Sequence, residues 1–131
     1  MSDAVLFDTS VLIDPRSADL GEFATASPSV SAVTVAELAY GLDTHDPLER
    51  HVRGERLDWV LSRFPVLPFD LAEARLYGTL AALVRRAGRD PRPRRMDLQI
   101  AATAVTNSLP LLTRNEKDFT GLDRLLRVVP V

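Results

Sequence analysis

Short runs of apolar residues alternate along the chain with longer segments whose apolar residues recur every three or four positions. The first run, residues 4–7, is apolar at every position, which is typical of a strand buried on both faces of a parallel sheet. Further short strands are predicted at 29–31, 65–69, 109–113 and around 128–129. The prolines within 65–69 favour an edge of the sheet, because proline cannot donate a hydrogen bond to a central ladder.

Helices are predicted between these strands. The segment 33–42 is apolar nearly all round, and 47–64 carries apolar residues at helical spacing. Asp70 and Glu73 form a capping-box pair that begins a helix running to about residue 87. This alternation predicts one α/β domain over residues 1–131, a three-layer α/β/α sandwich with a central parallel sheet of four to five strands. A short apolar turn is predicted at 11–13, and the remaining helical segments at 20–24, 97–107 and 115–119.

Composition narrows the classes of function. A chain of 131 residues with 46% hydrophobic and 26% charged residues is typical of one globular domain. The formal net charge of −2 argues against binding nucleic acid through overall charge, although local arginine patches stay possible. The sequence contains no cysteine, which excludes disulfides and thiolate metal sites.

Targeting and cofactor signals are missing from the sequence. The N-terminus has no basic segment followed by an apolar one, as a signal peptide would. The longest uncharged run, residues 98–113, is too short and too polar to span a bilayer. We therefore expect a cytoplasmic protein. The glycine patterns of dinucleotide and P-loop sites are also missing, which disfavours an enzyme with a nucleotide cofactor.

Four carboxylates occupy positions that are unusual for solvated surface charges. Asp8 directly follows the first predicted strand, and Glu37 is the single charged residue between positions 23 and 43. Asp97 opens a helix on its apolar face, and Asp118 lies just after the strand that ends at Thr113.

Each acid also has a purely structural interpretation. Asp8 and Asp118 are ordinary cap or turn residues, and Asp97 is favourably placed at a helix N-terminus. Thr34 and Glu37 match a capping box, in which the glutamate reaches back to a backbone N–H. For each acid taken alone, the structural interpretation therefore stays open beside the functional one.

Considered together, the four acids predict a metal site. The ends of parallel strands share one edge of a sheet, where ligands bind in α/β folds. Two carboxylates about 4 Å apart repel by about 4 kcal/mol at an effective dielectric constant near 20, so such a cluster needs a cation or protons. Oxygen ligands without histidine or cysteine favour Mg²⁺ or Mn²⁺. His45 and His51 both lie far from these positions in the sequence.

The order and spacing of these acids resembles the PIN-domain ribonucleases, and most closely the VapC toxins of bacterial VapBC toxin–antitoxin pairs. The resemblance covers essentially the whole chain. The segments that carry it are Leu6-Phe7-Asp8-Thr9-Ser10, Ser31-x-x-Thr34-x-x-Glu37-Leu38-x-x-Gly41, Asp97-x-x-Ile100-Ala101-Ala102-x-Ala104 and Thr113-Arg114-Asn115-x-x-Asp118-Phe119.

The resemblance implies a PIN-like fold, dependence on Mg²⁺ or Mn²⁺, and hydrolysis of RNA phosphodiester bonds. It also implies a homodimer and inhibition by a small VapB-type antitoxin. Asp8 and Asp97 would then be direct metal ligands, while Glu37 and Asp118 would bind the metal directly or through water. All four would be catalytic.

Neighbouring residues extend this hypothesis. The hydroxyls of Thr9, Ser10 and Thr113 and the side-chain amide of Asn115 are candidates to orient the metal ligands or water. The segment 85–96 departs from the resemblance, because it has six arginines and two prolines where relatives have a short, less charged loop. It is either a solvated loop or an arm that holds RNA phosphates, and we favour the second. The candidate RNA-binding residues are Arg92, Arg94, Arg95 and Arg114.

Two other functions stay open. One is a small Mg²⁺-dependent phosphohydrolase, which often needs a second acid two residues after the first, where this chain has Ser10. The other is a non-catalytic PIN-like module that binds RNA or protein, which would not need four clustered acids. A nuclease assay with a chelator control separates both from a metal-dependent ribonuclease.

Overall fold

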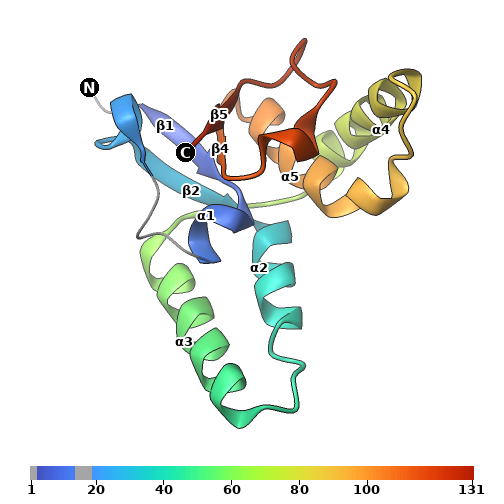
Figure 1. The fold of residues 1–131 in the computed structure, drawn as a ribbon. Coiled ribbons are helices and arrows are strands. Elements are labelled where there is room, and N and C mark those ends of the chain that lie inside the picture. The colour runs from blue at the N-terminus through green and yellow to red at the C-terminus, as the bar shows by residue number, and fades with distance from the viewer. Residues whose placement is uncertain (1–2, 14–18) are drawn as a thin grey trace.

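The computed structural model describes residues 3–13 and 19–131 of the chain. Its centre is a sheet of five strands in the order β3-β2-β1-β4-β5, and every neighbouring pair is parallel (Figure 1). The predicted parallel sheet is therefore confirmed, and β3 lies at its edge as the prolines indicated. The strands are β1 (Ala4–Phe7), β2 (Ser27–Ser31), β3 (Val66–Leu67), β4 (Leu111–Thr113) and β5 (Val128–Pro130).

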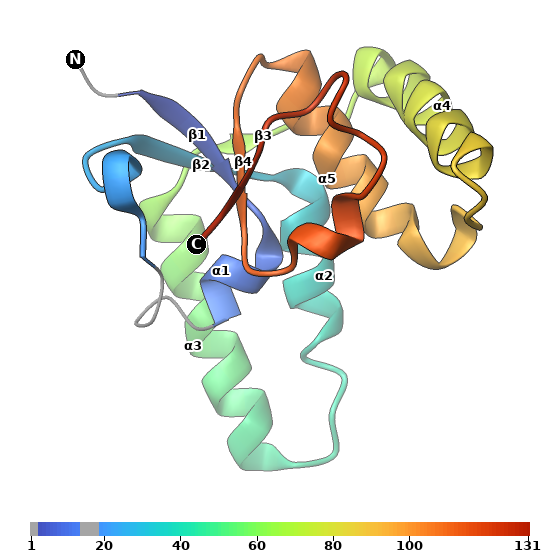
Figure 2. The same cartoon turned by 45° about the horizontal axis from the view of Figure 1, so that its top comes forward.

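Helices cover both faces of the sheet (Figures 1 and 2). Helices α4 and α5 contribute side chains to a hydrophobic cluster on one face, and α1 and α3 contribute to a cluster on the other. Helix α2 contributes to both clusters. The predicted three-layer arrangement is thus confirmed. The helices are α1 (Thr9–Ile13), α2 (Ala32–Tyr40), α3 (Pro47–Arg63), α4 (Leu71–Arg86) and α5 (Arg95–Thr106), with short 3₁₀ helices η2 (Gly21–Phe23), η3 (Arg92–Arg94) and η4 (Glu116–Phe119).

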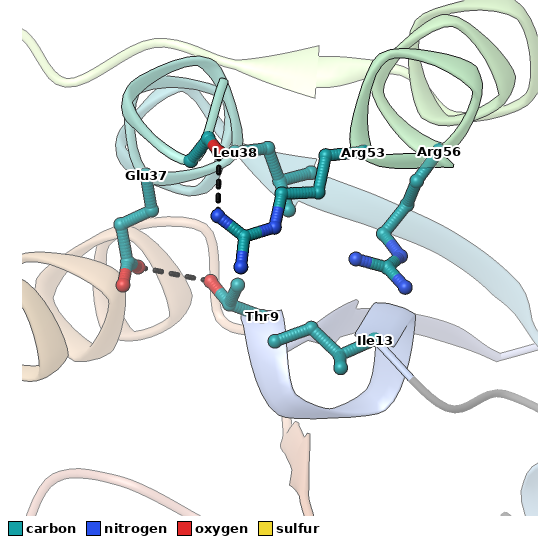
Figure 3. Close-up of a pocket in the computed structure, with 7 residues that line it drawn as sticks. Thr9, Ile13, Glu37, Leu38, Arg53 and Arg56 are labelled. Carbon is teal, nitrogen blue, oxygen red and sulfur yellow. Dashed lines mark hydrogen bonds between the residues drawn. The ribbon is translucent and has the colours of Figure 1, made fainter. Parts of the chain in front are cut away.

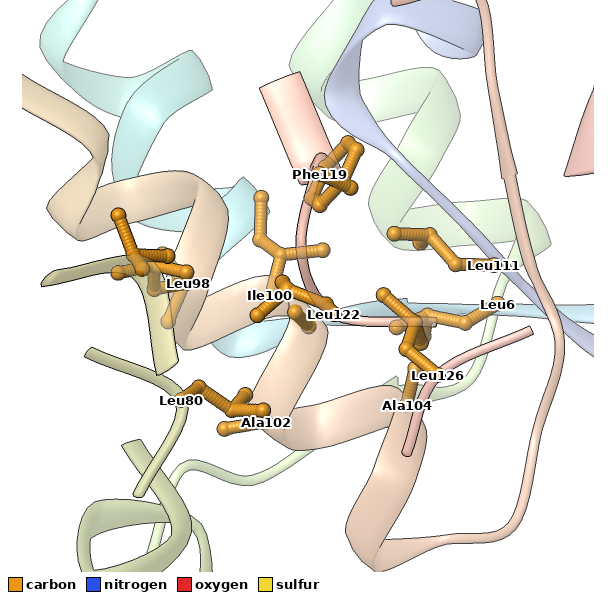
Figure 4. Close-up of a cluster of buried hydrophobic side chains, with 13 residues drawn as sticks. Leu6, Leu80, Leu98, Ile100, Ala102, Ala104, Leu111, Phe119, Leu122 and Leu126 are labelled. Carbon is orange, nitrogen blue, oxygen red and sulfur yellow. The ribbon is translucent and has the colours of Figure 1, made fainter. Parts of the chain in front are cut away.

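The two clusters explain why β1 is apolar at successive positions. Successive side chains of a strand point to opposite faces of its sheet. Leu6 therefore packs with α4 and α5, while Val5 and Phe7 pack with α1 and α3. Figure 4 shows Leu6 and Leu111 among the leucines and alanines of the first cluster. Because both faces are covered, the end of β1 is held rigidly.

Local capping signals set where the helices begin and end. The Asp70–Glu73 capping box that begins α4 is confirmed, with the Asp70 N–H donating to Glu73 Oε1 at 2.9 Å. The predicted stop near Gly88 is confirmed too, because that glycine has a φ of +83°. Helix α5, however, begins at Arg95 rather than Asp97. Part of the preceding segment forms η3, with Pro91 as its N-cap and Pro93 inside it, and η3 runs directly into the helix and shortens the predicted basic loop.

The register of the sheet brings the ends of two distant strands together. Phe7 pairs with Leu112, and the Asp8 N–H donates to the Leu112 carbonyl at 2.9 Å. Asp8 therefore leaves β1 beside Thr113, the last residue of β4. Within the two described ranges, no helix is long and apolar enough to cross a membrane.

Candidate active site

Asp8 is a buried carboxylate held by two hydroxyl groups. It is only 4% exposed at the carboxyl end of β1. Its Oδ2 accepts hydrogen bonds from Ser10 Oγ at 2.7 Å and from Thr113 Oγ1 at 2.8 Å. Burying a carboxylate is costly unless such donors replace water, so these hydroxyls offset the cost of its burial and fix its direction.

The same hydroxyls are themselves oriented by the backbone that follows β4. Ser10 Oγ accepts from the Arg114 N–H at 3.1 Å, and Thr113 Oγ1 accepts from the Asn115 N–H at 3.0 Å. Each hydroxyl hydrogen is therefore directed to Asp8. Of the residues predicted to orient the ligands, Ser10 and Thr113 contact Asp8 through their hydroxyls, and Asn115 contacts Thr113 through its backbone N–H.

Glu37 lies in the second turn of α2 and is held by Thr9. The predicted alternative, a capping box with Thr34, is wrong because Ser31 is the N-cap and accepts from the Val33 N–H at 3.0 Å. Thr9 Oγ1 instead donates to Glu37 Oε1 at 2.9 Å. Burial raises the pKa of the Glu37 carboxyl above its ordinary value, against the lowering effect of the Thr9 hydrogen bond.

Thr34 is a member of the site that sequence reasoning assigned only to a cap. Its Oγ1 lies 3.0 Å from Thr9 Oγ1 and is fully buried. Because the single hydrogen of Thr9 goes to Glu37, Thr34 is the donor in this contact. No local signal in the sequence places Thr34 beside Thr9, 25 residues earlier, because the Ser31-x-x-Thr34-x-x-Glu37 spacing indicates only a helix cap.

Asp97 is the acid whose pKa is affected by all three of the others. It lies in the first turn of α5. Burial raises its pKa to about 6, and the negative charges of Asp118, Asp8 and Glu37 add to that rise. The structure therefore brings the other three predicted acids within electrostatic reach of Asp97. Asp8, Glu37, Asp97 and Asp118 are called the acid cluster below.

Arg94 supplies a positive charge to the acid cluster. Its Nη1 donates to Asp118 Oδ1 and lies 3.8 Å from Asp97 Oδ2. This guanidinium lowers the pKa of Asp97, but less than burial and the neighbouring acids raise it. Of the predicted RNA-binding residues, Arg94 is thus paired with the acids, whereas Arg92 and Arg95 are exposed to solvent. The backbone of Arg114 contacts Ser10.

The residues of the acid cluster fit a hard divalent cation by their chemistry. All four offer carboxylate oxygens, and their formal charge with Arg94 is −3 when all are ionised, from four negative charges and one positive. Within residues 3–13 and 19–131, no three acidic side chains converge closely enough to hold a metal as they stand. Arg94 pairs with two of the four acids, Asp97 and Asp118.

Two cavities flank the acid cluster. One, of about 300 Å³, is lined by Glu37 and Thr9 together with Arg53 and Arg56 of α3 (Figure 3). The other, of about 480 Å³, includes Asp118 and Arg94 in its lining. Sequence reasoning missed the two α3 arginines, although their spacing of three places them on neighbouring positions of one helix surface.

The PIN domain family matches residues 5–125 of the chain. The chain belongs to this family. It is 30% identical over 130 residues to "Ribonuclease VapC" of Rickettsia bellii, with 92% of each chain covered. It is 33% identical over 124 residues to "Ribonuclease VapC5" of Mycobacterium tuberculosis, covering 92% of this chain and 88% of the relative.

A solved structure agrees with this assignment. A VapBC-5 structure from Mycobacterium tuberculosis, described as a member of the VapBC family of toxin–antitoxin systems, covers 98% of each chain at 32% identity with a TM-score of 0.81. The predicted VapC-type PIN domain is therefore confirmed, and its fold places the acid cluster at the carboxyl edge of the sheet.

We expect the Asp97→Asn substitution to stabilise this PIN domain at neutral pH when no metal is bound. A carboxyl whose pKa is raised on folding binds more protons in the folded state, so its contribution to stability falls as pH rises from about 4 through about 6. The substitution should raise the free energy of unfolding by up to about 3 kcal/mol at pH 7.5. Urea unfolding in EDTA at pH 7.5 and pH 4.5 measures the effect, which should shrink at the lower pH.

Exposed Asp58 on α3 provides the control for that experiment, because Asp58→Asn removes the same charge away from the acid cluster. An increase in the free energy of unfolding for Asp97→Asn that is the same at both pH values would contradict the interpretation. So would a loss of stability at pH 7.5.

The Thr113→Val substitution should destabilise the protein more than Thr113→Ser, which removes only a buried methyl group. Valine keeps the shape of threonine but removes one of the two hydroxyl donors to buried Asp8, whereas serine keeps that donor. Loss of a donor to a buried charged group costs about 1–3 kcal/mol. Thermal unfolding measures the difference, and equal stability of the two variants would show that the hydroxyl does not stabilise Asp8.

Proposed function

We infer that this PIN domain is a ribonuclease, the toxin of a type II toxin–antitoxin pair that is inhibited by a VapB-type antitoxin. Both relatives described above are named ribonucleases, and the similar solved structure belongs to the VapBC family of toxin–antitoxin systems. The finer proposals are that cleavage is endonucleolytic, depends on Mg²⁺ or Mn²⁺, and takes place in the cytoplasm. The homodimer implied by the resemblance belongs to the same proposal.

The acid cluster is the single observation that carries the catalytic proposal. Burial and then three other carboxylates raise the pKa of Asp97, and a fold that needed only stability would not gather such charges. Asp8 and Asp97 would hold the cation directly, with Glu37 and Asp118 binding it directly or through water. When bound, the cation supplies a water of lowered pKa and stabilises negative charge on the reacting phosphate.

The residues of the chain would position the reactants. Ser10 and Thr113 keep Asp8 directed, and the Thr34–Thr9 pair keeps Glu37 directed, so the carboxylates need little reorganisation during reaction. Buried side chains on both faces of β1 hold this edge of the sheet in place. Once Arg94 is released from the acids, its guanidinium is free to contact an RNA phosphate.

The two alternative functions fit these contacts less well. A phosphohydrolase often needs a second acid two residues after the first, but Ser10 occupies that place here and its hydroxyl donates to Asp8 Oδ2. A module that only binds RNA would gain nothing from four negative charges facing a polyanion. A metal-dependent ribonuclease accounts for both features.

Asp8→Asn and Asp97→Asn should each lower RNA cleavage by at least about 100-fold while the protein stays folded. Each substitution removes a negative charge from a proposed ligand but keeps the size of the side chain. Cleavage of a fluorescent RNA in Mg²⁺, with an EDTA control and circular dichroism of each variant, measures the effect. Exposed Asp123→Asn serves as the matched control and should cleave like the wild type.

Activity that survives EDTA, or that persists in folded Asp8→Asn protein, would contradict the proposed site. Release of inorganic phosphate from small phosphate esters without RNA cleavage would favour the phosphohydrolase instead. RNA binding without any cleavage would favour the binding module.

A further inference from the structure

The cavity of about 300 Å³ beside Glu37 carries two arginines that the catalytic proposal does not use. It lies between α1, α2 and α3, with Ile13 and Leu38 forming part of its apolar wall (Figure 3). The guanidinium groups of Arg53 and Arg56 both point into it from α3. We call this space the arginine cavity, and its volume is at the lower end of the range for ligand sites.

Arg53 is held in place by its neighbours. Its Nη1 donates to the Gly41 carbonyl at 2.8 Å, and its Nη2 lies 3.5 Å from Glu49 Oε2. These contacts fix the plane of the guanidinium but leave some of its five N–H donors for another acceptor. A fixed guanidinium loses little conformational entropy when it binds an oxyanion, so Arg53 is preorganised for such a ligand.

Arg56 lies one turn further along α3 and faces the same space. It is partly buried, and within residues 3–13 and 19–131 the structure gives it no ion-pair or hydrogen-bond partner. Two like charges three residues apart on a helix repel each other. A partly buried pair of guanidiniums with this repulsion is stabilised by an anion placed between them.

The arginine cavity is continuous with the proposed reaction centre. Thr9 and Glu37 line it, and their hydrogen bond forms one of its walls (Figure 3). An anion held by the arginines therefore lies next to the acid cluster. RNA carries a phosphate at every nucleotide, so a strand whose reacting phosphate is at the acids presents another phosphate nearby.

We propose that Arg53 and Arg56 form a subsite that binds a backbone phosphate of the RNA next to the one that is cleaved. The inference rests on the proposed ribonuclease function and names how its substrate is held. Arg56 provides the adaptable contact, and Arg53 provides the fixed one. The subsite binds backbone rather than bases, so it contributes affinity and register without reading sequence.

RNA binding by a cleavage-deficient protein tests the proposal. Fluorescence anisotropy of a 5′-labelled single-stranded RNA is measured in Mg²⁺ with Asp8→Asn protein, alone and combined with Arg56→Gln, Arg56→Lys or Arg53→Gln. Arg75→Gln is the charge-matched control, because Arg75 is exposed on α4 at the opposite face of the sheet. Circular dichroism and thermal unfolding confirm that each variant is folded.

Arg56→Gln should raise the dissociation constant for RNA roughly tenfold, because losing one hydrogen bond to a charged group changes affinity by about that factor. It should also reduce the slope of log affinity against log salt concentration by about 0.7, the value for one phosphate contact to a single strand. Arg56→Lys should restore most of that slope. In the cleaving protein, Arg56→Gln should raise KM with kcat nearly unchanged.

RNA affinity and salt slope that are unchanged in Arg56→Gln, while wild-type protein still cleaves RNA, would overturn the subsite and leave the ribonuclease function standing. Unchanged RNA affinity with weakened inhibition by the antitoxin would also overturn it and assign the cavity to a protein partner. An equal loss of affinity in Arg75→Gln would mean that the effect is general charge attraction and not a subsite. Failure of the wild type to cleave RNA would contradict the proposed function itself.

Discussion

Repulsion among carboxylates gathered at one end of a parallel sheet is the constraint on which the rest of this structure depends. Its effect is clearest at Asp97, whose pKa is raised by burial and by three neighbouring acids. The chain limits the cost with hydroxyl donors to Asp8 and with the guanidinium of Arg94, and the packed faces of β1 prevent the acids from separating. The remaining repulsion lowers stability locally, as expected for a site built for function rather than for stability.

Much of this arrangement follows from the sequence because the signals involved are local. The uninterrupted apolar run of β1 predicts a strand covered on both sides, and the capping pair of Asp70 and Glu73 marks the start of α4. The acids of the cluster stand out because each follows a strand, lies near the start of a helix or interrupts an apolar helix. Parallel topology then places them on one edge without any knowledge of side-chain contacts.

The contacts across the fold could not be predicted in this way. Local spacing assigned Thr34 to a capping box with Glu37, but the cap is made by Ser31, and Thr34 turns to a residue 25 positions earlier. A spacing of three on a helix is the same for two solvated arginines as for Arg53 and Arg56, which face a cavity. Tertiary packing alone distinguishes these cases, and it also determines which arginine of the basic segment reaches the acids.

Anomalous diffraction from crystals soaked in Mn²⁺ at neutral pH tests the central claim most directly. The account predicts strong anomalous density for Mn²⁺ within about 2.0–2.6 Å of carboxylate oxygens of Asp8 and Asp97. This is the range for hard divalent cations bound by oxygen. The same soak of Asp97→Asn crystals should lose that density. Ordered acids with no Mn²⁺ between them at saturating concentration would show that the cluster does not exist to hold a cation.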